Sequence, residues 1–356
     1  MTDVNVNQEL LAKELNISVG TVSKALRNYP DVSAKTKTKV LELAKKLGYR
    51  PYLSNMQFTE QKTDVKFVGV LTQTPFKNYS QIEYLSGMSA VSSELNVSQF
   101  VHNYTADTCY DVLDPALQPP MLRESMVSGL ILVHRWPREI VKQLAARYTC
   151  VSIVHDYTDL GVSYVGLDNS GAISMLFDQL YKLGHREIGF IGKNKEQTWS
   201  MARFGGYCQS MAMYGLDICN ENIFDCELKL LEDKSYDWEE YFDFDAIAAR
   251  LESGVTAWMC SADWCAYNLF AAMKRRGYDV PADIAITGFD SAETTNLGCP
   301  QVTTVDVDSQ LLGRRALRLL VDLIENRETG CCKVVHKCEY NKGASIAAPK
   351  TATVVC

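Results

Sequence analysis

A stretch near the N-terminus combines small hydroxyl side chains with basic ones at a spacing that suits contact with nucleic acid. If residues 19–27 are helical, the polar side chains that share one face are Thr21, Ser23, Lys24 and Arg27. Hydroxyl groups and a helix N-terminus can bind phosphates, and Lys24 can reach a base edge in the major groove. The charges by themselves favour a solvated basic face on a small helical domain, so the prediction of DNA binding depends on the neighbouring motifs.

A second pair of residues, Arg203 and Asp290, has the chemistry to bind a polyhydroxylated ligand. Arg203 lies in a Gly-rich segment between a strand and a helix, and Asp290 follows a strongly apolar strand. Open α/β sheets bind ligands at the carboxyl ends of their strands. A guanidinium and a carboxylate can each engage two vicinal hydroxyls. The alternative is that the two side chains pair with each other across a cleft.

No catalytic or metal-binding motif accompanies these residues in the sequence. It contains no nucleophile elbow, Walker motif, complete dinucleotide fingerprint or H-E-x-x-H. His134 and His185 have no second ligand at a metal spacing, so both are interpreted as structural, and we expect neither a metal nor a cofactor. The twelve cysteines include no C-x-x-C pair, which is typical of reduced thiols in a cytosolic chain.

Three short helices are expected to position the polar face of residues 19–27. Apolar residues recur at helical spacing in residues 7–15, in residues 19–27 and between Ser33 and Leu47. Ser18 and Ser33 are the expected N-caps of the second and third helices. One shared apolar face makes the three helices a compact bundle.

Length and charge favour a small basic head on a larger acidic body. At 356 residues the chain exceeds one ordinary domain. Residues 1–60 hold nine Lys or Arg and six Asp or Glu, a net charge of +3, whereas the remainder holds 27 and 37, a net charge of −10. This asymmetry fits DNA binding at one end. No apolar run approaches the roughly 18 residues of a membrane span and the polar N-terminus is no signal peptide, so we expect a cytoplasmic protein.

Beyond residue 65 the chain alternates short apolar strands with amphipathic helices, which predicts parallel sheets flanked by helices. The expected strands are Phe67–Leu71, Val97–His102, Leu130–His134, Val151–His155, Tyr164–Leu167, Ile188–Ile191, Thr256–Cys260, Ile284–Thr287 and Val302–Val305. Helices are expected at Ile82–Leu95 and Ala172–Leu183 among others. One doubly wound sheet contains fewer strands than this. We therefore predict an α/β body of two lobes.

The order of motifs in the head closely resembles the lactose-repressor/galactose-repressor (LacI/GalR) family of transcriptional regulators. The matching strings are Ile17-Ser-Val-Gly-Thr-Val-Ser-Lys-Ala-Leu26, Val32-Ser33 and Leu47-Gly-Tyr-Arg-Pro51, without a gap in the spacing. The resemblance implies a helix-turn-helix head over residues 1–50 and a dimer that reads a palindromic operator. The residues it assigns to DNA contact are Ser18, Thr21, Ser23, Lys24, Arg27, Lys35, Thr36, Tyr49 and Phe58.

Residues 51–62 would be the hinge, which in the family folds on the operator and inserts a leucine into the minor groove. Phe58 occupies that wedge position and is a suitable intercalating side chain. Asn55 and Met56 replace the usual small residue and arginine. Together with Arg27, which stands where the family commonly has Asn, these departures mean that an operator sequence does not carry over.

The body resembles the family's effector domain, and the whole resemblance covers roughly residues 6–346. The expected effector domain comprises residues 63–356. The landmarks in order are Gly166-Leu-Asp-Asn169, Leu183-Gly-His-Arg-Glu-Ile-Gly-Phe-Ile-Gly192, Ala202-Arg-Phe-Gly-Gly206, Pro281-Ala-Asp-Ile-Ala-Ile-Thr-Gly-Phe-Asp290 and Val302-Thr-Thr-Val305. They imply a periplasmic-binding-protein-like pair of lobes with a ligand between them. The expected first lobe comprises residues 63–163 and 292–322, and the expected second lobe comprises residues 164–291 and 323–356.

Matching by position extends the expected effector-binding set beyond Arg203 and Asp290. The additional residues are Phe76, His155, Trp238 and Asp263. Phe76 and Trp238 can stack on a sugar ring, although a place in the core or in a lid is an alternative for each. Trp264 can be either stacking or core. Asp168 and Asn169 can touch the ligand or only close the turn between lobes.

These observations predict a ligand-controlled transcriptional regulator, a repressor by family frequency, with a sugar or sugar derivative as effector. A nucleobase-like or phosphorylated corepressor is the alternative within the family. An enzyme or a solute-binding receptor is the alternative outside it, and neither would explain residues 1–60. A homodimer is expected, because two-fold operators need paired heads. The apolar stripe of Ile82, Leu85, Met88 and Leu95 can serve the core or the dimer face.

Overall fold

The computed structural model describes residues 8–26, 32–47, 65–73, 79–226, 242–291 and 301–350. The chain divides into two compact units, Met1–Thr63 and Asp64–Cys356, which we call the head and the body.

The head is a bundle of three helices, as the sequence predicted: α1 (Gln8–Leu15), α2 (Val19–Leu26) and α3 (Ala34–Leu47). The Ser18 hydroxyl accepts a hydrogen bond from the Thr21 N–H at 3.0 Å, and Ser33 accepts one from the Thr36 N–H at 3.2 Å. Each serine therefore caps its helix by satisfying an N–H that has no partner within the helix. The side chains at the centre of the bundle are Leu11, Ala12, Val22, Ala25, Val32, Val40 and Ala44.

The first lobe of the body is built on a parallel sheet of six strands in the order β11-β5-β4-β3-β1-β2. Its strands are β1 (Lys66–Gln73), β2 (Val97–Tyr104), β3 (Gly129–Val133), β4 (Thr149–Ile153), β5 (Ser163–Leu167) and β11 (Lys333–His336). Its helices are α4 (Tyr79–Ser92), η1 (Cys109–Leu113), α5 (Pro120–Arg123), α6 (Arg138–Ala145), η2 (Thr158–Leu160) and α12 (Ser309–Ile324).

Both faces of this sheet are covered, which is why β3 reads as the continuous apolar run Gly-Leu-Ile-Leu-Val. Ile131 and Val133 pack with residues of α4 and α12 on one face. Leu130 and Leu132 alternate to the other face and pack with residues of α5 and α6. Met88 lies in the first of these cores, whereas Ile82 is exposed, so the stripe on α4 is divided between core and surface.

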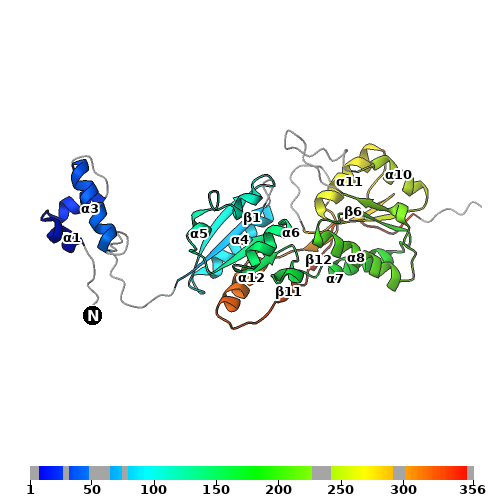
Figure 1. Cartoon of the computed structure of the whole chain (residues 1–356). Helices are drawn as coiled ribbons and strands as arrows, with labels where there is room; N and C mark the ends of the chain where they lie inside the picture. The colour runs from blue at the N-terminus through cyan, green and yellow to red at the C-terminus, as the bar shows by residue number, and fades with distance from the viewer. Residues whose placement is uncertain are drawn as a thin grey trace, which may run out of the picture. The chain divides into compact units, whose positions relative to one another are not determined.

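The second lobe contains a parallel sheet of four strands in the order β7-β6-β8-β9 and an antiparallel pair of strands, β10 and β12. Its strands are β6 (Ile188–Lys193), β7 (Ile223–Asp225), β8 (Ala257–Cys260), β9 (Ala285–Thr287), β10 (Thr304–Asp306) and β12 (Glu339–Asn341). Its helices are α7 (Asn169–Leu183), α8 (Thr198–Met213), η3 (Asn220–Asn222), α10 (Phe244–Glu252) and α11 (Asp263–Arg275). Helices α7 and α8 cover one face of the parallel sheet, and α10 and α11 cover the other (Figure 1).

The nine strands expected from the sequence are all present, and three short ones, β7, β11 and β12, were not predicted. The chain crosses between the lobes after Leu167, between Asp306 and Ser309, and between His336 and Glu339. The expected crossings near residues 163, 292 and 322 were therefore too early. The reason is pairing: β5 stays in the first sheet between β4 and β11, while β10 pairs with β12 in the second lobe.

Two glycines allow α4 and α12 to approach until their backbones touch. A Cβ atom at Gly87 would lie 2.0 Å from the carbonyl oxygen of Gln310, and one at Gly313 would lie 2.1 Å from that of Tyr84. No side chain fits at either place. The close approach places Gly87 against the backbone of Gln310 and Gly313 against that of Tyr84.

We predict that Gly313→Ala lowers the free energy of unfolding of the body by about 1–3 kcal/mol, because the new methyl group meets rigid backbone rather than a flexible side chain. Gly205→Ala is the matched control, since it changes a helical glycine on α8 that has nothing within 4 Å. This control should be stabilising by up to about 1 kcal/mol. Urea unfolding followed by tryptophan fluorescence reports on the body alone, because all five tryptophans lie after residue 135. Equal stabilities of the two variants would refute the packing argument.

Candidate functional site

A cavity of about 830 Å³ lies between the two lobes, at the carboxyl ends of strands from both. Its volume suits a small molecule. The described residues that line it are Ser80, Glu83, Tyr84, His134, Val154, Tyr164, Gly166, Leu167, Asn169, Trp199, Arg203, Trp264, Asp290, Ser291, Asp306, Val307, Asp308, Ser309, Gln310 and Leu312. Arg203, Asp290 and the end of β5 thus line one space. The sequence placed Arg203 between a strand and a helix, but it lies within α8 and reaches the cavity from that helix.

Arg203 is held rigidly in the wall of this cavity, with only 4% of its surface exposed. Its guanidinium donates from Nε to Asn169 Oδ1 at 2.9 Å and from Nη1 to the Ser261 carbonyl at 2.6 Å. The guanidinium carbon also lies 3.4 Å from the centre of the Phe289 ring and 4.7 Å from that of Trp199. Planar stacking and fixed donors are the properties that distinguish Arg from Lys.

Asp290 completes the arrangement by accepting a hydrogen bond from Arg203 Nη2 at 3.0 Å. Its backbone φ of 103° lies in the left-handed region that favours glycine, so the backbone at Asp290 is strained. This conformation places the carboxylate beside Arg203. The side chain keeps 41% of its surface accessible, which we attribute to the cavity that it lines. Surrounding protein nevertheless raises the pKa of the carboxyl by desolvation, while Arg203 opposes the shift. The two residues pair with each other and also line the cavity.

Aromatic side chains form much of the remaining wall. Trp199 and Trp264 come from the second lobe, and Tyr84 and Tyr164 come from the first. Burial raises the pKa of each tyrosine to about 12, so both hydroxyls are neutral donors at physiological pH. Flat apolar faces with a few polar groups at their edges suit a molecule with one apolar and several polar sides.

The two histidines that follow β3 and β4 lie differently from what the sequence indicated. His134, interpreted from the sequence as structural, lines the cavity, and its Nε2 is buried with no hydrogen-bond partner among the described residues. Burial lowers its pKa to about 4. His155, an expected effector ligand, is only 3% exposed and is not among the lining residues. Burial lowers its pKa to about 3, so both rings are neutral at pH 7.

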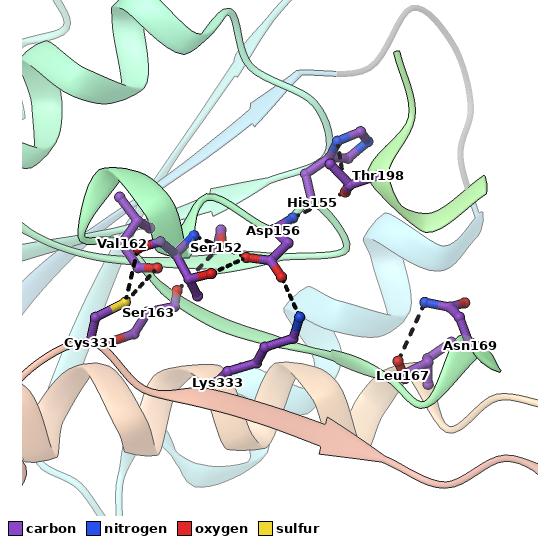
Figure 2. Close-up of polar contacts among 11 residues, drawn as sticks. Ser152, His155, Asp156, Val162, Ser163, Leu167, Asn169, Thr198, Cys331 and Lys333 are labelled. Atoms are coloured by element: carbon purple, nitrogen blue, oxygen red, sulfur yellow. Dashed lines mark hydrogen bonds and ion pairs between the residues drawn. The ribbon is translucent and has the colours of Figure 1, made fainter. Parts of the chain in front are cut away.

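His155 instead belongs to a set of contacts between the lobes (Figure 2). Its Nδ1 lies 3.5 Å from the Thr198 hydroxyl at the start of α8, and the Asp156 N–H donates to the same hydroxyl at 3.1 Å. The Asp156 carboxylate accepts from Lys333 Nζ on β11 at 2.6 Å. The loop after β4 therefore joins strand β11 of the first lobe to helix α8 of the second lobe.

Asp263, also expected at the cavity, is buried elsewhere. It accepts a hydrogen bond from the Thr304 hydroxyl at 2.7 Å, is 1% exposed and is not among the lining residues. Its neighbour Trp264 faces the cavity instead. Asp168 caps α7 by accepting from the Gly171 N–H at 2.9 Å, and Asn169 lines the cavity. Of that adjacent pair, one residue is structural and the other belongs to the site.

In the head, the described residues of the expected DNA-binding face lie along α2 and at the start of α3. Ser18, Lys24 and Lys35 are exposed, and Thr21, Ser23 and Thr36 are partly so. The hydroxyls of Ser18 and Ser33 cap their helices. Each hydroxyl also lies 2.8 Å from the hydroxyl of the threonine three residues later in the chain, Thr21 and Thr36 respectively. Five expected site residues lie outside the described residues: Arg27, Tyr49, Phe58, Phe76 and Trp238.

Several lining residues were missed from the sequence. Asp306 and Asp308 directly follow the expected strand Val302–Val305, so the strand-end rule could have identified them. Glu83 and Tyr84 gave no such signal, because their helix shows only an apolar stripe. Trp199 is the fourth residue before Arg203, which places both on one face of α8.

Comparison with known proteins matches both units. Residues 11–52 match the bacterial regulatory proteins of the lacI family, and residues 177–346 match the periplasmic binding protein-like domain. The HTH-type transcriptional regulator RegA of Clostridium saccharobutylicum is 26% identical over 325 residues, which cover 89% of this chain and 92% of RegA.

Among solved structures, the Lac repressor dimer bound to operator and the anti-inducer ONPF aligns with a TM-score of 0.66 at 18% identity, covering 97% of this chain and 100% of that one. The transcriptional regulator CelR in complex with cellobiose aligns with a TM-score of 0.62 at 21% identity, covering 96% and 100%. The predicted architecture, a helix-turn-helix head followed by two lobes like those of periplasmic binding proteins, is confirmed.

The buried histidines make stability depend on pH. The pKa of His155 is about 3 in the folded body and near its ordinary value of 6.5 when unfolded, so the unfolded chain binds a proton that the folded chain does not. Stability is therefore lost as the pH falls below 6.5, by about 2 kcal/mol between pH 6.5 and 5. We predict that His155→Gln flattens the pH dependence of the free energy of unfolding by this amount. Identical slopes in the two proteins, measured by urea unfolding, would contradict the burial of a neutral ring.

Proposed function

The chain belongs to the LacI family of bacterial regulatory proteins, and from that premise we propose that it represses transcription by binding operator DNA under the control of a small ligand held between its lobes. The observation that carries this proposal is the cavity wall formed by Arg203, Asp290 and Trp199 in a chain that also has a helix-turn-helix head.

The head supports sequence-specific contact with the major groove through α2. Lys24 is exposed near the end of this helix, and the helix N-terminus, capped by Ser18, suits a phosphate. Lys35 and Thr36 at the start of α3 would add phosphate contacts. Arg27, Tyr49 and Phe58 remain assigned to DNA contact by their positions in the motif. The Lac repressor binds its operator as a dimer, and we propose a homodimer on a palindromic operator here.

The cavity supports a carbohydrate effector. Tryptophan faces and a fixed guanidinium–carboxylate pair offer stacking together with several donors and acceptors, which a sugar ring requires. CelR, which shares the fold, binds cellobiose. The runner-up is a nucleobase-like or phosphorylated corepressor. Phosphate is the less suitable of these, because four carboxylates line the cavity and Arg203 is the only Lys or Arg among the described lining residues.

Within this proposal Arg203, Asp290 and Trp199 contact the effector directly, with His134 and Trp264 beside them. Phe76 and Trp238 remain proposed as stacking residues. His155 and Asp263 act indirectly, His155 through the contact with Thr198 and Asp263 by holding Thr304. Control of DNA binding follows if ligand favours one arrangement of the lobes over another, which shifts the population of paired heads that fit the operator.

We propose a regulatory rather than a catalytic role, in the cytoplasm where the DNA is. The curated relative RegA is a transcriptional regulator. A solute-binding receptor would not need the head. In the part of the chain that the structure describes, no helix is long and apolar enough to cross a membrane.

We predict that Lys24→Ala weakens operator binding by about 1–3 kcal/mol, because it removes a base-edge contact. The operator is first selected from random duplexes with the full-length protein, and affinity is then measured at several salt concentrations.

Lys13→Ala is the matched control for this experiment. It removes an exposed lysine from the last turn of α1, outside the proposed DNA-binding face. Its affinity should stay close to that of the unchanged protein. If Lys24→Ala leaves both the affinity and the salt dependence as they were, α2 is not the reading helix.

A further inference from the structure

The carboxylates that line the cavity differ in how they are neutralised. Asp290 pairs with Arg203 at 3.0 Å, and Asp308 caps α12 and lies 3.3 Å from Arg314. Within the ranges that the structure describes, the partners of Glu83 and Asp306 are neutral: Gln310 Nε2 donates to Glu83 at 2.7 Å, and Asn341 Nδ2 donates to Asp306 at 2.7 Å. Among the described residues no Lys or Arg makes an ion pair with either of these two.

The two uncompensated carboxylates come from different lobes. Glu83 lies on α4 in the first lobe, and Asp306 ends β10 in the second. Like charges that face one cavity repel each other, and the repulsion grows as water is excluded. A cation bound between them would turn this repulsion into attraction to both lobes. The charge of the ligand would then favour the arrangement in which the lobes are close.

The remaining polar groups do not supply a positive charge for an anionic ligand. Arg203 already donates hydrogen bonds to Asp290, Asn169 and the Ser261 carbonyl. His134 is a neutral ring, because burial lowers its pKa to about 4. Its Nε2 is buried and has no hydrogen-bond partner among the described residues, which leaves a polar position at the cavity for a ligand group to satisfy. The faces of Trp199 and Trp264 suit both a sugar ring and a cation.

Resting on the proposed function, we infer that the effector is a positively charged polyol of sugar size, such as an amino sugar, whose ammonium group is bound by Glu83 and Asp306. Its hydroxyls meet Arg203, Asp290 and His134. This assigns Glu83 and Asp306 as residues that determine specificity.

The test is calorimetric titration of the full-length protein with matched sets of sugars. Each set contains a neutral hexose, its 2-amino form, the N-acetylated amine and the 6-phosphate, in the gluco, galacto and manno configurations, with the corresponding disaccharides. The amine of at least one set should bind roughly tenfold more tightly than its neutral and acetylated forms, the gain expected from a charged hydrogen bond. Rising salt should weaken the binding of the amine and leave that of neutral sugars unchanged.

Two variants locate the preference. Glu83→Gln and Asp306→Asn should each reduce the preference for the amine, and Asp306 is exposed, so its variant keeps the fold intact. Glu139→Gln is the control, since it neutralises an exposed glutamate on α6 that does not line the cavity. It should bind as the unchanged protein does.

The outcomes separate this inference from the function on which it rests. If a neutral, acetylated or phosphorylated sugar binds as tightly as the amine, the cationic effector is refuted and the carbohydrate effector stands. A preference for the amine that survives in both variants would refute the assignment of Glu83 and Asp306. Binding of none of these sugars would overturn the carbohydrate effector itself.

Discussion

The site depends on one buried cation, the guanidinium of Arg203. Its carbon lies 3.4 Å from the centre of the Phe289 ring and 4.7 Å from that of Trp199, and its nitrogens donate to Asn169, Ser261 and Asp290. A single side chain therefore joins the start of α7 to the segments that follow β8 and β9. A buried charge is tolerated only when its partners are fixed. The contacts with Arg203 hold Trp199 and Asp290 in the cavity wall. The backbone of Asp290 is strained, so forming this wall costs free energy.

The opposite wall is set by packing rather than by charge. Gly87 and Gly313 let α4 and α12 meet backbone to backbone, which places Glu83 beside Gln310 and Tyr84 at the cavity. In the part of the chain that the structure describes, three segments pass between the lobes, and two of them carry residues that line the cavity: Asn169 after the first and Asp306 to Ser309 in the second. A ligand that touches both walls therefore also touches the segments about which the lobes would move, so binding and lobe arrangement are coupled.

Much of this arrangement could be predicted from the sequence because it depends on local patterns. Buried parallel strands appear as apolar runs, Ser18 and Ser33 precede their helices as caps, and Asp290 follows an apolar strand. Arg203 meets Asp290 from within α8, which the strand-end argument did not predict. What failed depends on partners that are distant in sequence. Strands β7, β11 and β12 are three or four residues long and exist only through pairing. Asp263 follows a strand but accepts a hydrogen bond from Thr304. His134 and His155 both follow strands, but His134 lines the cavity whereas His155 contacts Thr198 on α8.

The central claim is that occupancy of this cavity sets affinity for DNA. The most direct test measures operator affinity of the full-length protein with and without a saturating cavity ligand, in the unchanged protein, in Trp199→Ala and in Tyr110→Ala, an exposed aromatic outside the cavity lining. We expect ligand to change operator affinity by roughly 5–150-fold in the unchanged protein and in Tyr110→Ala, the usual range of coupling between sites. We expect little effect of ligand in Trp199→Ala. Ligand that binds the unchanged protein yet leaves its operator affinity constant would contradict the central claim.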